Sequence, residues 1–169
     1  MAAGSTYTPI ATYTVPSAQS SYTFSSVPST YTDLVLVLNL VSTSAGSSDV
    51  NINFNGDNSA LYSRTYLAGT GTSPGNSGRA GTTSTIQINN WSSVTTAAGY
   101  NAVINIMNYA NTNVFKTVIA RTNNAANAAE TSLDLYRSTS AISSILVAAG
   151  ASRQFDIGST LTLYGITAA

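Results

Sequence analysis

The stretch Asp49-Val-Asn-Ile-Asn-Phe-Asn55 decides the fold class, because it alternates polar and apolar side chains without a break. Its apolar residues fall on one side and its amide side chains on the other, which is the period-two pattern of a half-buried β-strand. We expect the row of asparagines to face solvent. The stretch ends at Asn55-Gly56, a pair that suits a tight turn since both residues tolerate positive φ.

The same alternation recurs along the chain. It predicts further strands at 85–89, 102–108, 131–137 and 159–165. Within 131–137, we expect Leu133 and Leu135 to face the core, opposite Asp134 and Tyr136.

Other segments predict strands for different reasons. Segments 33–41 and 144–148 are apolar on both faces, which is typical of central strands covered on both sides. The β-branched segment 114–121 predicts another strand, whereas 7–15 and 21–24, interrupted by prolines, predict edge strands. Helical periodicity is nearly absent, although 58–66 has room for a turn or two of helix. The glycine-rich segment 69–81 predicts an exposed loop.

These patterns predict an all-β protein: a single antiparallel β-sandwich, jelly-roll-like, in one domain over residues 1–169. Residues 1–20 could form an extended N-terminal arm. The expected core residues are Leu34, Leu36, Leu38, Val50, Ile52, Phe54, Ile86, Ile88, Ile104, Ile106, Val118, Leu133, Leu135, Ile145, Val147, Leu161 and Leu163.

The polar composition is unusual. The chain holds 25 Ser, 24 Thr and 16 Asn, while only 7% of its residues are charged, against about 25% in ordinary soluble domains. Six basic residues balance six acidic ones, so we expect no nucleic-acid binding and no attraction to anionic membranes. A net charge near zero also gives little colloidal protection, which suits a protein that works in an assembly.

Residue types also limit the chemistry. The chain has no Cys and no His, which removes disulfides, the common zinc sites and every Ser-His or Cys-His nucleophile. We expect no signal peptide, because the first basic residue is Arg64, and no membrane span, because the longest aliphatic run covers only 34–38. The chain is therefore expected to be made in a cytoplasm, with no catalytic residue, cofactor or metal ligand.

Four weaker patterns deserve a physical test. Segment 69–81 lacks the Gly-Lys-Ser/Thr of a phosphate loop, and the only lysine, Lys116, lies far away. Asn51-Ile-Asn-Phe-Asn-Gly56 resembles the start of a calcium loop, but Tyr62 stands where a bidentate Glu is needed. A serine nucleophile would depend on Lys116 alone. Trp91 and the ten tyrosines are more often packing residues than a sugar-binding platform.

Paired carboxylates for glycoside hydrolysis are a further formal option. Among the acidic residues, only Glu130 and Asp134 lie close together on one face of a predicted strand. We expect nothing beside them to raise either pKa, so a structural role is favoured. A pair assembled from different strands stays open.

Several motifs resemble a family of small structural proteins of tailed bacteriophages, frequent in marine phages and cyanophages, and the similarity covers nearly the whole chain. The most specific of these motifs is the strand Gly158-Ser-Thr-Leu-Thr-Leu-Tyr-Gly-Ile166 near the end. The others are Tyr7-Thr-Pro-Ile-Ala-Thr12, Ser29-Thr-Tyr-Thr-Asp-Leu-Val-Leu-Val37, Phe54-Asn-Gly-Asp57 with Tyr62, Asn108-Tyr-Ala-Asn111 leading into Phe115-Lys-Thr117, and Leu135-Tyr-Arg-Ser-Thr-Ser-Ala-Ile142.

The resemblance implies a virion component, assembled in the host cytoplasm, with a β-sandwich fold. The first hypothesis is a non-enzymatic capsid decoration (cement) protein that contacts the major capsid protein, as a homotrimer like other cement proteins. The second is a tail-fibre or receptor-binding domain that recognises host glycans through 69–81 and Trp91. The third is a glycan-cleaving enzyme that uses an Asp/Glu pair. The resemblance carries no ligand-contacting residue over to this chain.

Overall fold

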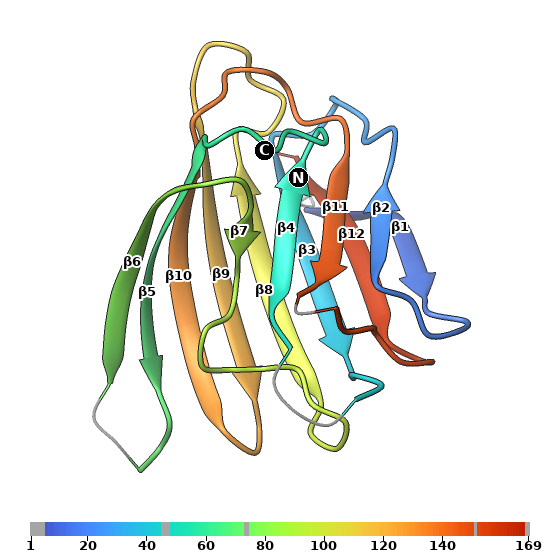
Figure 1. Ribbon diagram of the computed structural model, residues 1–169. Coiled ribbons are helices and arrows are strands. Elements are labelled where there is room, and N and C mark those ends of the chain that lie inside the picture. Colours follow the sequence, from blue (N-terminus) through green and yellow to red (C-terminus); the bar gives the residue numbers. More distant parts are fainter. Residues whose placement is uncertain (1–5, 45–47, 73–74, 151, 168–169) are drawn as a thin grey trace.

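The computed structural model describes residues 6–44, 48–72, 75–150 and 152–167 (Figure 1). These residues form a β-sandwich of two antiparallel sheets, and none of them is helical. The predicted all-β class and antiparallel sandwich are therefore confirmed. In Figure 1 the smaller sheet lies in front of the half of the larger one that begins at β1, while β10, β5 and β6 extend past it.

The strand bounds follow the predicted ranges closely except in the middle of the chain. In spatial order, the eight-stranded sheet contains β1 (Tyr7–Thr14), β12 (Thr160–Ile166), β3 (Asp33–Leu40), β8 (Tyr100–Met107), β9 (Lys116–Asn124), β10 (Ala128–Tyr136), β5 (Tyr62–Gly69) and β6 (Asn76–Thr83). The four-stranded sheet contains β2 (Ser21–Phe24), β11 (Ile145–Ala149), β4 (Val50–Phe54) and β7 (Ile86–Gln87).

The strand pairing is nested. If the hairpins β5–β6 and β9–β10 are set aside, eight strands remain, and β1 pairs with β12, β2 with β11, β3 with β8 and β4 with β7. Further ladders join β12 to β3 and β11 to β4. The two hairpins lengthen the large sheet beyond β8, and we call these four strands (β9, β10, β5 and β6) the wing.

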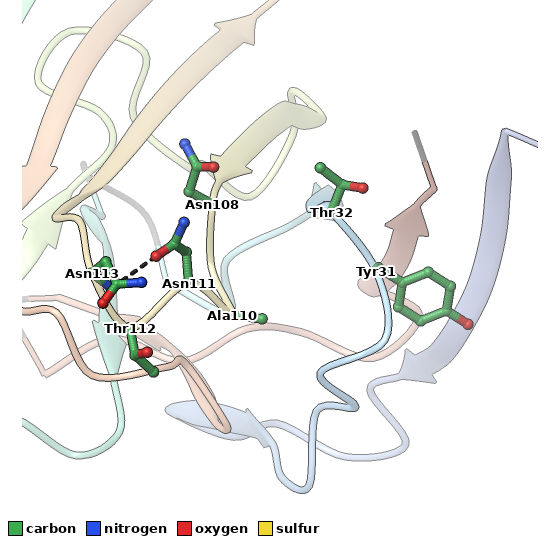
Figure 2. Close-up of a pocket in the computed structure, with 7 residues that line it drawn as sticks. All are labelled: Tyr31, Thr32, Asn108, Ala110, Asn111, Thr112 and Asn113. Atoms are coloured by element: carbon green, nitrogen blue, oxygen red, sulfur yellow. Dashed lines mark hydrogen bonds between the residues drawn. The ribbon is translucent and has the colours of Figure 1, made fainter. Parts of the chain in front are cut away.

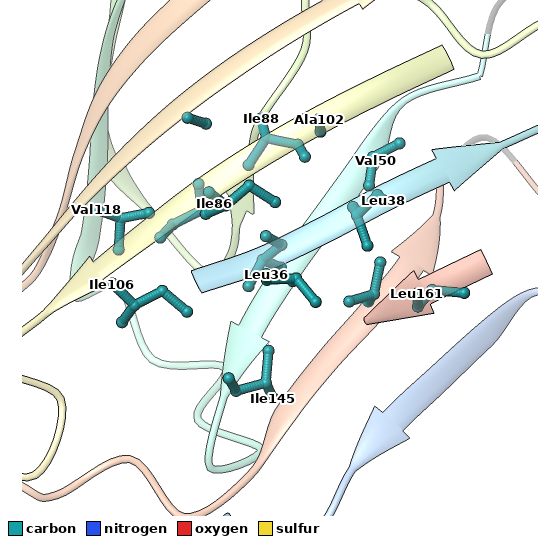
Figure 3. Packing of buried hydrophobic residues seen from close by; sticks show 14 of the residues in the cluster. Leu36, Leu38, Val50, Ile86, Ile88, Ala102, Ile106, Val118, Ile145 and Leu161 are labelled. Carbon is teal, nitrogen blue, oxygen red and sulfur yellow. The ribbon is translucent and has the colours of Figure 1, made fainter. Parts of the chain in front are cut away.

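The hydrophobic core lies between the two sheets (Figure 3). Leu36 and Leu38 of β3 face Val50 of β4 and Ile145 of β11 across this layer. Fifteen of the seventeen predicted core residues are buried. Such residues come from alternate positions of each strand, as the period-two pattern requires.

The two exceptions lie on β10, where the predicted orientation was wrong. Leu133 and Leu135 are 55% and 43% exposed, whereas Asp134 and Tyr136 point inward and are buried. Tyr136 faces inward because it stacks on Tyr62, with 4.7 Å between ring centroids, and also packs against Phe54 at 5.5 Å.

Three further expectations need correction. Residues 58–66 form no helical turn, because β5 begins at Tyr62. Segment 69–81 is not a loop throughout, since β6 begins at Asn76; residues 73 and 74 lie outside the described residues. Strand β3 is central, but its second face is only partly covered: Val35 is buried, Val37 half-buried and Asn39 exposed.

The Asn55-Gly56 turn is confirmed. Both residues have positive φ, 57° and 65°, and the Asp57 N–H donates to the Phe54 carbonyl at 2.9 Å. The turn does not close a hairpin, because it leads from β4 in the small sheet to β5 in the large one. The predicted edge strands β1 and β2 are also confirmed, since each ends its sheet.

Candidate functional site

The inner face of the wing holds half of the buried polar residues of the described chain, seven of fourteen. The segment 87–93 lies over this face and is bound to it by side chains of β5, β9 and β10. The buried polar residues of the wing are Arg64, Lys116, Thr122, Asn124, Glu130, Ser132 and Asp134. Because buried polar groups need partners, the contacts of these residues decide what they can do.

Arg64 of β5 joins the wing to the segment above it. Its guanidinium donates to the carbonyls of Gln87 and Asn89, and its Nη2 donates to Asn90 Oδ1 at 3.3 Å. The guanidinium carbon also lies 4.7 Å from the centroid of the Tyr66 ring. These contacts satisfy most of its donors, although Nε has no partner.

Asp134 pairs in register with Arg64 across β10 and β5 and is fully buried. Ser132 Oγ donates to its Oδ2 at 2.7 Å, while Oδ1 has no partner. Burial raises the pKa of the Asp134 carboxyl to about 7, and the charges of Arg64 and Glu130 act in opposite directions on it. The expectation that nothing here raises a carboxyl pKa was therefore wrong.

Glu130 has a structural role in the same cluster. Its Oε2 accepts the backbone N–H groups of Asn90 at 2.8 Å and Trp91 at 3.0 Å. Glu130 and Asp134 share one face of β10 four residues apart, which separates their backbones by roughly 13 Å. Glycosidases use carboxyl pairs about 5–9.5 Å apart that are open to substrate. This buried, widely spaced pair does not fit that chemistry.

Lys116 is held by backbone carbonyls. Its Nζ donates to the carbonyl oxygens of Asn111 at 2.6 Å, Val114 at 2.9 Å, Thr139 at 3.0 Å and Ser138 at 3.3 Å. Burial lowers the pKa of this amine. The side chain thus fastens the 111–114 loop to the 138–139 segment and is committed to this role.

A polar pocket of about 410 Å³ lies at the end of β8 and is formed by two loops (Figure 2). Its asparagines partly satisfy one another, since the Asn113 N–H donates to Asn111 Oδ1 at 2.8 Å. Figure 2 shows the Tyr31 ring pointing away from Asn111 and Asn113. This ring lies over Gly165, where an added Cβ would come within 2.3 Å of it. Among the described residues, Tyr31 is thus the one aromatic residue that lines the pocket, and its ring packs on Gly165 rather than facing the asparagines.

The outer face of the wing exposes aliphatic side chains, whereas its inner face buries polar ones. Leu67 of β5 is 62% exposed and pairs with Thr131 of β10, so Leu133 is its diagonal neighbour on the same face. Leu135 lies beyond Leu133 along β10 on that face. Half-buried Ile119 of β9 pairs in register with Leu133. A contiguous set of exposed aliphatic side chains on one sheet face is typical of a surface that contacts another molecule.

The residues proposed from sequence for glycan binding are not gathered into one site by any of these contacts. Trp91 is 37% exposed, and its backbone is bound to Glu130 and to the Asn127 side chain. In the calcium-like stretch, Asn53 is buried rather than facing solvent, because its amide donates to the carbonyls of Asp57 and Ser84. The described residues contain no group of three or more Asp or Glu that could hold a metal ion.

Sequence reasoning missed Arg64 and the outward leucines. One signal was present, because the buried residues Tyr62, Arg64 and Ala68 fall on even-numbered positions of β5. Since they are an aromatic, a charged and a small residue, they do not form the polar–apolar alternation by which a strand is predicted. None of the described residues belongs to a helix long and apolar enough to cross a membrane.

Comparisons with protein-family models, with curated proteins and with solved structures find no match to this chain.

Proposed function

We propose that this chain is a non-enzymatic structural protein of a tailed-phage virion, a capsid decoration protein that stabilises contacts between major capsid subunits. The observation that carries the proposal is the outer face of the wing, where Leu67, Leu133 and Leu135 are exposed on a broad sheet face. Exposed aliphatic patches of this kind mark contact surfaces in soluble proteins.

The interior of the protein supports a structural role. Arg64, Lys116 and Glu130 all bind backbone groups of neighbouring segments and thereby fix loops in place. Amide and hydroxyl side chains dominate the remaining polar composition, and they can bond to neighbours without the cost of burying ions. Such a surface suits permanent assembly better than catalysis.

We also propose that the sandwich is a jelly roll with two inserted hairpins. The nested pairing of β1 with β12, β2 with β11, β3 with β8 and β4 with β7 supports this description, because a jelly roll is a long hairpin folded over on itself. The β5–β6 and β9–β10 hairpins are then insertions that build the wing. A homotrimer, as in other cement proteins, is part of the same proposal.

The alternative role, a tail-fibre or receptor-binding domain, predicts a different stoichiometry. The test is the copy number of this chain in purified virions, measured by quantitative gel or mass spectrometry. Hundreds of copies per particle are expected for decoration. About a dozen copies, as in a closed ring, would instead indicate a tail component, and complete absence from particles would contradict both roles.

A further inference from the structure

The outer face of the wing combines aliphatic side chains with positive charge. Arg79 on β6 and Arg121 on β9 are exposed on the same face as Leu67 and Leu133. In register, Arg79 pairs with Thr65, and Arg121 pairs with Thr131, so the two arginines flank the leucines on either side.

No carboxylate balances these arginines on the outer face of the wing, all four strands of which are described. Within the wing, the acidic residues are Glu130 and Asp134, and both point inward and are buried. The outer positions of β10 are Ala129, Thr131, Leu133 and Leu135. This face therefore offers apolar contact in its middle and unbalanced positive charge at its margins.

The pattern favours a partner of opposite charge over a second copy of the same surface. Two such faces packed together would place arginines of like charge in one interface, which disfavours association. A surface with aliphatic side chains flanked by carboxylates would complement both features. We propose that the outer face of the wing is the docking surface for a protein partner of this chemistry, which under the proposed function is the major capsid protein.

The size of the wing sets how far the partner must extend. Its strands have 8 or 9 residues. At about 3.4 Å per residue and about 4.8 Å between strands, the wing offers a footprint of roughly 500 Å². A stable interface needs about 800 Å² from each partner. The footprint therefore continues across β8 to β3, where Val103 and Val37 are half-buried on the same face and pair in register.

A shallow hollow of about 520 Å³ lies next to Leu67 on this surface. It is lined by residues of β5, β6 and β10, including Ala129, Thr131 and Ser77 from the outer face. An aliphatic side chain of the partner can enter it beside Leu67. We therefore expect Leu67 and Leu133 to dominate the affinity, with the arginines fixing orientation.

The inference rests on the proposed function and is tested with virions that lack this chain, produced from a phage with its gene deleted. Purified chain is added, the particles are pelleted, and the bound fraction is measured. The double variant Leu67→Asp/Leu133→Asp should bind at least tenfold more weakly than the unchanged chain. The matched control is Ile157→Asp, which changes an equally exposed aliphatic residue outside the wing and should bind normally.

The charge component has its own pair of variants. Arg79→Glu/Arg121→Glu should weaken binding several-fold, whereas Arg79→Lys/Arg121→Lys keeps the charge and should bind nearly as well as the unchanged chain. Far-ultraviolet circular dichroism and thermal unfolding verify that each variant folds. For a variant that does not fold, Leu67→Thr/Leu133→Thr replaces the aspartates with residues well suited to strands.

The outcomes separate the two proposals. If the unchanged chain binds the particles and the leucine variants bind equally well, the docking surface is wrong, whereas the observed binding to the particle itself still supports the proposed function. If the unchanged chain does not bind, the proposed function fails and the inference fails with it. If sedimentation of the isolated chain shows an oligomer that the leucine variants dissociate, the occupant is a second copy, which also overturns the inference.

Discussion

Asp134 carries its carboxyl group into the interior of the wing, where no water molecule of the bulk solvent reaches it. Burial raises its pKa from 3.8 to about 7, so the folded state binds this proton more tightly than the unfolded state does. At pH values between 3.8 and about 7, the unfolded chain has lost this proton while the folded chain still holds it. The contribution of Asp134 to stability is therefore full below pH 4 and is lost as the pH rises to about 7.

We predict that the change in the free energy of unfolding caused by Asp134→Asn is more favourable at pH 8 than at pH 5. The difference should be a few kcal/mol, since one pKa unit corresponds to about 1.4 kcal/mol. Denaturant unfolding of both proteins at the two pH values measures this. Asp57 titrates with the opposite sign, because hydrogen bonds from Ser59 lower its pKa, but it affects both proteins equally. Equal effects of the substitution at pH 5 and pH 8 would contradict the prediction.

Lys116 leads to a second prediction at the scale of one residue. Lys116→Met keeps the length of the side chain but leaves four backbone carbonyls without their donor. A fully buried acceptor left unpaired costs about 1–3 kcal/mol. These carbonyls belong to exposed or half-buried residues, where water can replace part of the lost bonding, so we expect a loss of about 1–3 kcal/mol in the free energy of unfolding. A loss below 1 kcal/mol would show that the loops hold together without this amine.

At the scale of elements, the two leucines of β10 are exposed, whereas Leu36 of β3 is buried. Leu133→Ala and Leu135→Ala should each change the free energy of unfolding of the isolated chain by less than about 1 kcal/mol, because about half of each residue is already exposed to solvent and its removal leaves no closed cavity. Leu36→Ala on β3 should cost about 2–5 kcal/mol, since it leaves a cavity in the core. Thermal and denaturant unfolding compare the three, and a large loss at Leu133 would restore its predicted place in the core.

The β10 result also shows what the sequence could and could not predict. Strands whose inner positions are all apolar, such as β4 with Val50, Ile52 and Phe54, were oriented correctly because only that face could join the hydrophobic core. In β10, both faces mix apolar and polar residues. Its orientation depends on Tyr62 and on the backbone of segment 87–93, which supply partners for Tyr136 and Glu130 from distant parts of the chain.

The same reason explains why the candidate surface was missed. Exposed leucines look like core residues whenever the neighbouring strand is unknown, and β5 was not predicted as a strand. Arg64 carries a charge, which predicts an outward side chain, yet three acceptors from segment 87–90 allow it to be buried. Local alternation therefore predicted the sandwich, whereas the wing required long-range polar contacts that leave no local pattern.

For the whole molecule, the low charge predicts how it is retained in an assembly. Screening weakens interactions between charges, as the Debye length falls from about 10 Å at 0.1 M salt to about 3 Å at 1 M. With only six basic and six acidic residues in the chain, few exposed pairs can form in one interface, and each contributes about 0–1 kcal/mol. Under the proposed function, virions washed in molar salt should therefore keep this chain.

Urea should release the chain more readily than salt does, because urea solvates peptide and apolar groups. Gels of virions pelleted from low salt, high salt and moderate urea compare the conditions directly. Loss of the band in high salt alone would mean that the few charges, such as Arg79 and Arg121, dominate the interface.

The open edges of the two sheets determine how the protein behaves when it is concentrated. A long, regular edge strand is a template on which another chain can polymerise. Here β2 and β7 have only 4 and 2 residues, β1 carries Pro9 beside a register shift, and the pairing of β5 with β6 shifts between Tyr62 and Arg64. Because a chain without net charge has no electrostatic repulsion to keep its copies apart, these short and irregular edges are what disfavours fibril growth in a concentrated solution of the protein.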